Sequence, residues 1–496
     1  MSTVIEASAI DFERQREVAA ALRAFMPESS VMFEREDVQP YECDGLSAYR
    51  QIPMVVALAE SEAQVQRILK VCHEKRVPVV ARGAGTGLSG GALPLGNGVL
   101  LSLAKLMRIL EIDTEARTAR VQPGVRNLAI SEAAAPYGLY YAPDPSSQIA
   151  CTIGGNVAEN SGGVHCLKYG LTVHNILKLR AVTIEGELLE IGSDGLDAAG
   201  YDVLAVMTGS EGMLAVITEV TVKLLPKPEC AQVVMAAFDD VEKAGSAVAN
   251  IIAAGIIPAG LEMMDQAATV AVEHFVHAGY PTDVAGILLC ESDGTQEEVA
   301  EEVRRVEALM EHSGATLIRV SQTDSERLKF WAGRKAAFPA VGRISPDYYC
   351  MDGTIPRKRL AEVLRRIAEL ERKYGLRCAN VFHAGDGNLH PLILYDANEP
   401  GELERTEAFG GEILELSIKV GGTITGEHGV GIEKVNHMCV QFRTAELELF
   451  HAVKRAFDEY GLLNPGKAVP TLHRCAEFGR KHVHVGQERF PDLPRF

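Results

Sequence analysis

The densest glycine segment of this 496-residue chain, VPVVARGAGTGLSGGALPLGNG at residues 77–98, places the strongest limit on its fold. Gly85, Gly87 and Gly90 match the GxGxxG pattern of dinucleotide-binding loops. In a Rossmann fold, that loop must open a helix whose N-terminus receives the pyrophosphate. Here Pro94 and further glycines follow at once, and no helical pattern of apolar residues begins. The sequence therefore argues against NAD bound by a Rossmann fold.

A second glycine-rich stretch, PDPSSQIACTIGGNVAENSGGVHCLKYG, occupies residues 143–170. Glycine permits positive φ and close backbone approach, and successive bare N–H groups form a concavity that suits phosphate oxygens. Two such loops in one domain can line both ends of a flat cofactor, one at a pyrophosphate and one along the rings. On these residues alone, a purely structural role for the first loop has equal weight.

Length and charge exclude several classes of protein. Single hydrophobic cores stop growing near about 250 to 300 residues, so the chain must contain two or three packed units. Hydrophobic residues make up 47% and charged residues 23%, as in a folded soluble protein. The 49 Lys and Arg residues against 67 Asp and Glu residues give a net charge of −18. That field repels phosphate backbones and predicts that nucleic acid is not a partner.

The cysteines and the first residues point to a reduced, cytoplasmic setting. The ten cysteines are scattered without a CxxC pair, which excludes a zinc ribbon or an iron–sulfur cluster within this chain. The beginning of the chain carries acidic residues and lacks the basic and apolar regions of a secretory signal. No run approaches the roughly 18 apolar residues of a membrane span. We expect no direct membrane span.

The apolar pattern divides the chain into four parts. Residues 51–228 alternate short apolar runs with glycines around one helical stripe, which predicts an α/β unit. The two prolines of KLLPKPE end that unit, and residues 229–420 form a second α/β layer. An N-terminal helical segment at 1–50 precedes them, and a closing segment at 421–496 follows. We expect helices at 11–27, 60–74, 241–254, 297–312, 357–374, 402–419 and 444–460.

The segment VFHAGDGNLHPL, residues 381–392, predicts a histidine hairpin. Asp386 and Gly387 suit the central positions of a type I′ turn. A turn there places His383 opposite His390, with Cβ atoms about 4.5 to 5.5 Å apart. Two imidazoles at facing positions favour a shared metal ion. The alternative is that one of the histidines is a satisfied surface group.

A third metal ligand is suggested by GGTITGEHGVGIEK, residues 421–434. In extended backbone, neighbouring side chains point to opposite faces, so Glu427 can face the metal while His428 faces a substrate. Two histidines and one carboxylate leave open coordination positions, as a catalytic metal site requires. The alternative is that GEHG begins a helix and that its glutamate is an ordinary capping acid.

The two glycine loops, together with PGV at 123–125 and GSEGMLAVITE at 209–219, resemble the FAD-binding domain of the vanillyl-alcohol oxidase and p-cresol methylhydroxylase flavoprotein family. Covalent members often carry a histidine where this chain has Thr86, so the resemblance implies noncovalent FAD. It also implies the cofactor contacts. On the phosphate side these are Gly83, Ala84, Gly85, Thr86 and Gly87. Along the flavin they are Pro143, Thr152, Gly154, Gly155, Asn156, Ser161 and Gly162, with Glu211 and Ile217 as later contacts.

HAGDGNLH followed by GEHGVG is similar to the C-terminal domain of FAD-linked D-2-hydroxy acid dehydrogenases. Longer segments, among them YECDGLSAYR and FWAGRKAAFPAVGRISPDYYCMDGTIPR, are most similar to the FAD-linked subunits of bacterial glycolate oxidases. The implied fold is mixed α/β and α+β, with a two-part FAD-binding domain at 51–228 and a substrate and metal cap at 229–420. The implied ligands of a divalent metal, zinc, manganese or iron, are His383, His390 and Glu427.

The resemblance implies FAD-dependent oxidation of a small 2-hydroxy acid, above all glycolate to glyoxylate. His428 would remove the hydroxyl proton, and flavin would take the hydride. Arg334, in WAGRK, would bind the carboxylate, although on the residues alone it is equally a surface arginine. Lys467 has weaker support for the same task.

The absence of a cysteine cluster predicts that electrons leave to an external partner or a quinone rather than to NAD. The resemblance implies a second FAD subunit and an iron–sulfur subunit, and through them a peripheral place at the inner membrane. The tail from residue 471 is a candidate docking segment. Two alternatives are a stand-alone FAD-linked D-lactate dehydrogenase and a non-catalytic assembly subunit of such a complex.

Overall fold

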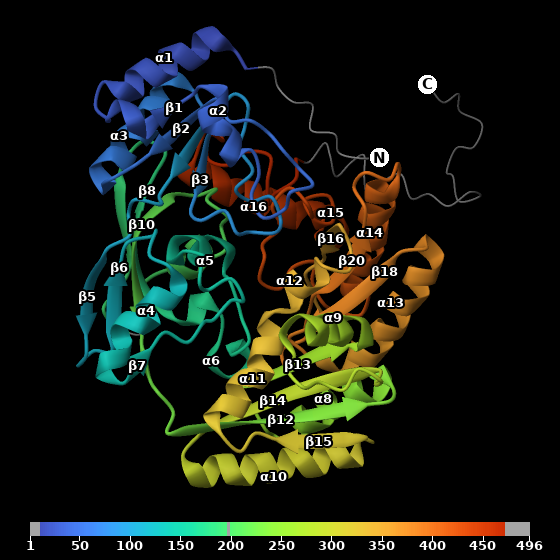
Figure 1. Cartoon of the computed structure of the whole chain (residues 1–496). Coiled ribbons are helices and arrows are strands. Elements are labelled where there is room, and N and C mark those ends of the chain that lie inside the picture. Colours follow the sequence, from blue (N-terminus) through green and yellow to red (C-terminus); the bar gives the residue numbers. More distant parts are fainter. Residues whose placement is uncertain (1–9, 196–198, 472–496) are drawn as a thin grey trace.

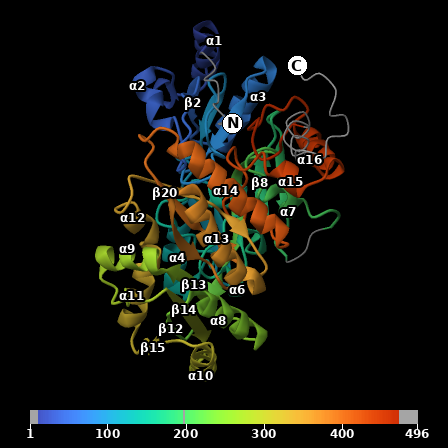
Figure 2. The same ribbon diagram turned by 90° about the vertical axis from the view of Figure 1, so that its right-hand side faces the viewer.

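The computed structural model describes residues 10–195 and 199–471, so the tail from residue 472 on, expected to dock a partner, lies outside the described residues. Three main sheets form the frame, with helices packed around them (Figures 1 and 2). The first two sheets belong to the glycine-rich half of the chain, and the third begins at residue 230, directly after the proline-containing segment.

The first sheet has the order β1-β2-β4-β3, and its β2, β4 and β3 run parallel. The crossover helix α3 (Glu62–Lys75) connects β2 to β3 and buries the apolar stripe that its sequence predicts, including Val65 and Ile68. The helix begins at Ser61, whose hydroxyl caps the Gln64 N–H group. The elements of this layer are α1 (Phe12–Arg23), β1 (Val31–Met32), α2 (Arg35–Val38), β2 (Val55–Leu58), β3 (Val79–Arg82) and β4 (Val99–Ser102).

The first glycine loop joins β3 to β4 without a helix. Gly85 and Gly90 in this loop adopt φ angles of +72° and +75°, which side chains rarely adopt. This confirms the reading of the loop as different from a Rossmann turn.

The second sheet is antiparallel in the order β5-β6-β10-β8-β9. Helix α5 begins inside the second glycine stretch, at TIGGN, and packs on β10. The elements are β5 (Ile109–Asp113), β6 (Thr118–Val121), α4 (Asn127–Ala134), α5 (Ile153–Glu159), α6 (Cys166–Tyr169), β8 (Ile176–Val182), β9 (Leu188–Gly192), α7 (Val203–Met207) and β10 (Val216–Lys223), with β7 (Leu139–Tyr140) and β11 (Leu225–Pro226) as a small pair.

The third sheet is antiparallel, in the order β15-β12-β14-β13-β18-β20-β16, and helices cover both faces. Alternate residues of β12 enter different cores: Val234 joins the cluster under one set of helices, and Val233 joins the cluster under the other. The strands are β12 (Cys230–Phe238), β13 (Gly260–Asp265), β14 (Gly286–Gly294), β15 (Leu317–Val320), β16 (Asp347–Cys350), β18 (Arg377–Phe382) and β20 (Pro391–Tyr395), with β17 (Gly353–Thr354) and β19 (Asn388–Leu389) as a second small pair.

The two faces of the third sheet differ in their surroundings. One face packs against α8 (Val241–Ala253), α10 (Gln296–His312), α13 (Leu360–Tyr374) and α14 (Glu402–Lys419). The other packs against α9 (Gln266–Val276), α11 (Asp324–Lys335) and α12 (Ala337–Val341), and its core includes Val164 from the glycine-rich half. Helices α11 and α12 therefore belong to the face that meets the glycine-rich half.

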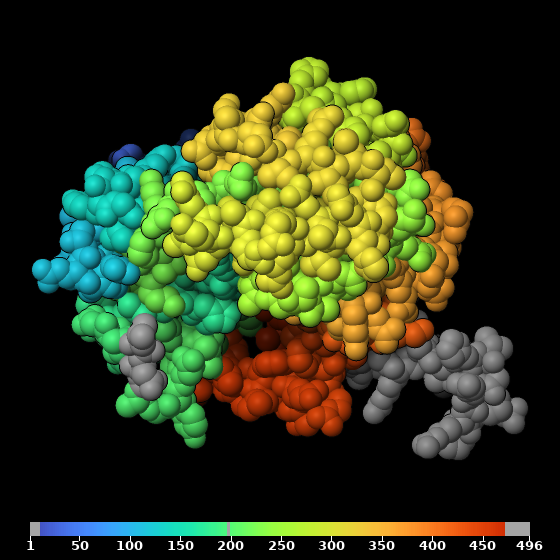
Figure 3. Space-filling model, turned by 90° about the horizontal axis from the view of Figure 1, so that it is seen from below, coloured from blue at the N-terminus to red at the C-terminus, as the bar shows by residue number. Residues whose placement is uncertain are grey.

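The closing segment returns to the first sheet. After α15 (Met438–Gln441) and α16 (Thr444–Phe457), Leu463 pairs in parallel with Val79 of β3, and its side chain joins the core of that sheet. Lys467, fully buried, donates to the carbonyl of Gly91. Seen from below, the red C-terminal residues lie against the green residues of the glycine-rich half (Figure 3). The last described residues therefore complete the glycine-rich half.

Candidate functional site

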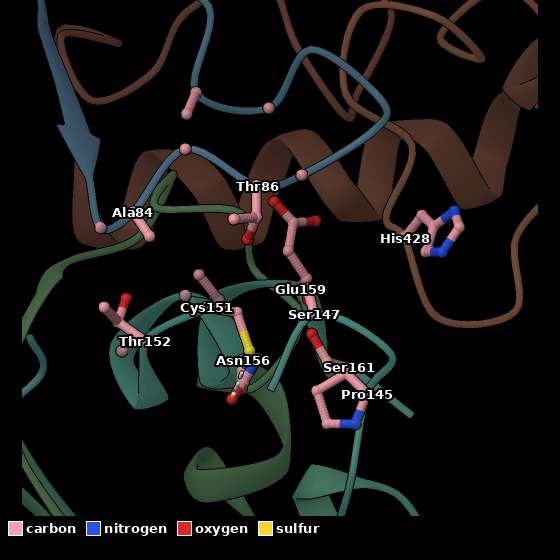
Figure 4. Close-up of a pocket in the computed structure, with 18 of the residues that line it drawn as sticks. Ala84, Thr86, Pro145, Ser147, Cys151, Thr152, Asn156, Glu159, Ser161 and His428 are labelled. Carbon is pink, nitrogen blue, oxygen red and sulfur yellow. Dashed lines mark hydrogen bonds between the residues drawn. The ribbon is translucent and has the colours of Figure 1, made fainter. Parts of the chain in front are cut away.

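One cavity of about 360 Å³ connects the two glycine loops with the histidine and glutamate motifs. Ala84 from the first loop and Thr152 from the second lie toward one end, and His428 lies at the other (Figure 4). Glu427 and His390 line the same cavity. Motifs separated by more than 200 residues thus share one site.

At two positions that border the site, only glycine fits, because a side-chain oxygen lies too close to leave room for a Cβ atom. A Cβ on Gly83 would lie 2.3 Å from the Thr152 hydroxyl, so the two loops contact each other at this point. A Cβ on Gly162 would lie 2.4 Å from Glu427 Oε2. The second glycine therefore leaves space for the glutamate rather than for the rings of a cofactor.

Most of the residues predicted to contact FAD line the cavity: Gly83, Ala84, Gly85, Thr86, Gly87, Thr152, Gly154, Gly155, Asn156, Ser161, Glu211 and Ile217. Pro143 and Gly162 are not among the lining residues, and the Pro143 carbonyl accepts a hydrogen bond from Asn127. The carboxylate of Glu211 accepts from the N–H groups of Val430 and Gly431 at 2.7 Å each. Glu211 therefore also attaches the GEHG segment to the glycine-rich half.

The histidine hairpin forms with a different register from the one predicted. His383 pairs with Asn388, and the Val381 N–H group donates to the carbonyl of His390. The register is shifted by two residues from the prediction, because the loop has four residues between the paired positions instead of two. An even shift keeps each side chain on its face of the sheet. The two imidazole rings therefore still meet, with centroids 5.0 Å apart.

Glu427 lies between the two imidazoles. Its Oε1 is 3.3 Å from Nε2 of His383 and 3.3 Å from Nε2 of His390. His428 does not point to the opposite face as predicted: its Nε2 is 3.5 Å from the same carboxylate oxygen, and its ring stacks on that of His390 at 4.8 Å. The prediction of opposite faces is wrong because the segment is not an extended strand.

Asp352, which the sequence analysis missed, determines the shape of the GEHG segment. Its carboxylate accepts hydrogen bonds from the backbone N–H groups of Gly426, Glu427 and His428. Lys434 Nζ lies 3.0 Å away, and both side chains are fully buried. Three consecutive donors converging on one carboxylate curve the backbone, so Glu427 and His428 face the same cavity.

The charges around this cluster change the pKa values of its members. Burial alone would lower the pKa of His383, but the carboxylates of Glu262 and Glu427 raise it well above its ordinary value. Burial alone would raise the pKa of Asp352, but Lys434 holds it well below the usual range. Burial lowers the pKa of His390 to about 4, so this imidazole is neutral at physiological pH.

The chemistry of the donor set fits a divalent metal. One nitrogen from each of His383 and His390 and one oxygen of Glu427 lie within 4.8 Å of one another. Nδ1 of His390 is buried and lacks a hydrogen-bond partner within residues 10–195 and 199–471, whereas its Nε2 lies 3.3 Å from Glu427 and 3.6 Å from Asp352. His383 Nδ1 is 2.8 Å from Glu262, which orients its Nε2 toward Glu427. A buried ring nitrogen without a partner is costly unless a ligand satisfies it.

Arg334, predicted to bind a substrate carboxylate, lies behind the cavity. Its side chain is 1% exposed and its Nη2 is 2.7 Å from Glu262, the same glutamate that orients His383. It is absent from the lining residues, whereas its neighbour Lys335 is among them. Lys467, the weaker candidate, is buried against backbone carbonyls of the first loop. Adjacent residues of a helix point in different directions. The WAGRK motif alone therefore does not show whether Arg334 or Lys335 faces the cavity.

The matches to protein families agree with this geometry. Residues 53–192 match the FAD binding domain, and residues 227–468 match the C-terminal domain of FAD linked oxidases. The chain is thus that of a flavoprotein oxidoreductase with an FAD-binding half and a C-terminal domain of the FAD linked oxidase type. The chain belongs to the FAD-linked oxidase family.

Relatives of known name cover nearly the whole chain. It is 64% identical over 479 residues to glycolate oxidase subunit GlcD of Escherichia coli strain K12, which covers 97% of this chain and 96% of that protein. It is 32% identical to a D-lactate dehydrogenase of Anaerostipes hadrus, over 84% of this chain and 89% of the relative.

Solved structures show the same fold. The 4-ethylphenol oxidase from Gulosibacter chungangensis has a TM-score of 0.79 at 16% identity, over 94% of this chain and 99% of that one. A p-cresol methylhydroxylase with substrate bound has a TM-score of 0.75 at 17% identity, over 94% and 98%. These confirm the predicted fold class. Among the helices of the described residues, none has the length and apolar character needed to cross a membrane.

We predict that Asp352→Asn destabilises the protein by about 3 to 5 kcal/mol, because it leaves the buried Lys434 ammonium without its counterion. Chemical denaturation of the FAD-loaded protein measures this, with the exposed Asp283→Asn as the matched control. The double variant Asp352→Asn/Lys434→Met should recover part of the loss, because no unpaired charge remains. Equal stability of Asp352→Asn and the control would contradict the assignment.

Proposed function

We propose that this protein oxidises glycolate to glyoxylate and passes the electrons to an external acceptor. The observation that carries the proposal is the single cavity that joins the glycine loops of the FAD-binding half to His390, Glu427 and His428. The 64% identity to a glycolate oxidase subunit supports the choice of acid.

The loop around Thr86 and the TIGGN segment would hold FAD without a covalent bond. Bound FAD supplies a hydride acceptor for the carbinol carbon of the acid. Thr86 lines the cavity at the position where covalent relatives often carry a histidine. Noncovalent FAD should therefore be released when the protein is precipitated with acid, which leaves a colourless pellet and a yellow supernatant. The glycines let backbone N–H groups approach the phosphates directly.

His383, His390 and Glu427 would hold a divalent metal, which supplies Lewis-acid polarisation of a bound hydroxyl and carboxylate. Glu262 supports His383 from behind, and Arg334 in turn balances the charge of Glu262. We therefore assign Arg334 as a positioning residue and not as a contact of the substrate.

His428 is the proposed general base. Its Nδ1 is buried, so Nε2 is the nitrogen that faces Glu427 and the cavity and would accept the hydroxyl proton. An imidazole suits proton transfer near neutral pH. The stacking of its ring on His390 fixes the direction of that nitrogen.

Lys335 is the cation that we propose for the substrate carboxylate. Its Nζ lies 3.8 Å from Asp144, whose carboxylate is already paired with His165 Nδ1 at 2.9 Å. Although burial disfavours a charged imidazole, Asp144 and Glu291 raise the pKa of His165 to about 10. His165 thus balances the charge of Asp144, and the Lys335 ammonium can bind the carboxylate of the substrate instead.

The reduced flavin would pass its electrons to partners. Within the described residues, the free cysteines lie on several separate elements and do not form a cluster. We propose a second FAD subunit and an iron–sulfur subunit as partners, with the complex at the cytoplasmic side of the inner membrane. The D-lactate dehydrogenase relative supports D-lactate as a second candidate substrate.

We predict that glycolate bleaches the flavin absorbance of the purified protein under nitrogen, and that His428→Asn slows this reduction by roughly 10²- to 10⁴-fold. Stopped-flow absorbance measures the rate. His312→Asn, an exposed substitution of the same kind on α10, should leave it unchanged. If no small 2-hydroxy acid bleaches the wild-type flavin, the proposed function is refuted.

His390→Ala should lose the divalent metal, because one of three proposed protein ligands is gone. Metal content after dialysis, measured by mass spectrometry of the elements, should fall well below one ion per chain. His274→Ala on the exposed side of α9 serves as the control. Retention of full metal content by His390→Ala would disprove the hairpin site.

Lys335→Met should raise the KM for glycolate by roughly ten- to a hundredfold with a smaller change in kcat, because a charge-assisted contact with the substrate is lost. Lys329→Met, on the same helix and exposed, is the matched control. Steady-state kinetics with an artificial electron acceptor measure both constants. An unchanged KM would show that Lys335 does not bind the substrate carboxylate.

A further inference from the structure

A carboxyl group that has no part in the chemistry above lies inside the cavity. Glu159, the last residue of α5, lines the cavity together with Thr86 and Ser161. Figure 4 shows its side chain pointing from the second glycine stretch toward the first glycine loop. A Cβ on Gly91 of that loop would lie 2.7 Å from Glu159 Oε1. The carboxyl group therefore reaches across the space between the two loops.

The carboxyl group of Glu159 adjoins that of Glu211. A Cβ on Gly429 would collide with Glu159 Oε2 and lie 3.0 Å from Glu211 Oε1, so both groups approach the same side of this glycine. Glu211 accepts from two backbone N–H groups, whereas Oε2 of Glu159 is buried and has no hydrogen-bond partner among the described residues. Hydrogen bonds to a carboxylate favour its charged form, and a neighbouring like charge disfavours a second one. Glu211 therefore carries the negative charge, and Glu159 is the neutral member of the pair.

The other groups that face Glu159 agree with a neutral form. Burial raises the pKa of Glu159 well above its ordinary value, and the carboxylates of Glu211 and Asp44 raise it further. The ammonium groups of Lys434 and Lys467 oppose this rise without cancelling it. A neutral carboxyl group has one O–H donor, whereas a carboxylate only accepts hydrogen bonds. Glu159 can therefore offer an O–H group to a molecule that fills the cavity.

We propose that Glu159 binds FAD as a neutral hydrogen-bond donor. Its O–H group donates to an acceptor atom of FAD, whose ring carbonyls, ribityl hydroxyls and phosphates all offer acceptors. A buried polar oxygen without a partner is unfavourable, and the bound cofactor satisfies it. The inference rests on the FAD binding of the proposed function and is the same for either acid.

This assignment makes FAD binding weaken as the pH rises. FAD binds the protein in which Glu159 is protonated, so the affinity is fully present below the pKa of Glu159 in the FAD-free protein and is lost as the pH rises through that value. Above it, Glu159 and Glu211 are two adjacent carboxylates, and the donor to FAD is gone. Lys467, whose pKa burial lowers to about 7, titrates near neutral pH, so variants of residue 159 are needed to separate the two groups.

The test measures the Kd for FAD from about pH 5 to about pH 9, a range in which ordinary carboxyl groups are largely ionised. Holoenzyme is diluted stepwise, and the fluorescence of the released FAD reports the bound fraction. We expect the wild-type Kd to rise by roughly tenfold or more over this range. Glu159→Gln keeps a neutral donor of the same shape, so its Kd should vary by less than about threefold. At the upper end this variant should bind FAD more tightly than the wild-type protein.

Two further variants complete the comparison. Glu159→Met has a similar size but no donor, so its Kd at the lower end should exceed that of the wild-type protein by roughly three- to tenfold. The exposed Glu132→Gln on α4, which lies outside the cavity lining, should reproduce the wild-type curve.

The outcomes separate this inference from the proposed function. If Glu159→Gln weakens FAD binding as much as Glu159→Met at the lower end, or follows the wild-type pH dependence, the assignment is overturned. If Glu159→Met does not fold, the pH dependence of Glu159→Gln decides the question. If the wild-type protein binds no FAD, both proposals fail. If it binds FAD that glycolate and D-lactate do not reduce, the proposed reaction is refuted, and the Kd values still test Glu159.

Discussion

The buried ion pair between Asp352 and Lys434 is the interaction on which the site depends. An unpaired charge in this position would be strongly unfavourable. Lys434 balances the Asp352 carboxylate, which also accepts hydrogen bonds from three consecutive backbone N–H groups. Those bonds curve the GEHG segment, so Glu427 and His428 face one cavity. The approach of Glu427 to His383 and His390 and the stacking of His428 on His390 follow from that curvature.

The same segment is held from the other side by the FAD-binding half. Glu211 accepts from two N–H groups just beyond His428, and Ser89 in the first glycine loop donates its hydroxyl to the Gly429 carbonyl. The GEHG segment is thus fixed between the C-terminal half, through Asp352, and the glycine loops. In the proposed reaction, the proton acceptor would have to stay at a constant separation from the flavin, and these attachments from both halves would supply that constraint.

The sequence predicts the repeated local features well and the long-range contacts poorly. Helix α14 has the predicted bounds of residues 402 and 419, because its apolar spacing is a local property. His383 and His390 converge although their register was predicted wrongly, since a shift of two residues preserves the face. The direction of His428 was not predictable, because it depends on Asp352, more than 70 residues away. Arg334 could not be separated from Lys335, because that choice is made by the packing of α11 on the third sheet.

The return of the chain to β3 has a consequence for synthesis. Strand β3 is the last strand of the first sheet, and Leu463 covers the edge that β4 leaves free. During translation this edge stays unprotected until almost the entire chain has left the ribosome, and an open strand edge readily pairs with other chains. The first sheet is therefore completed only after residue 463 has been synthesised.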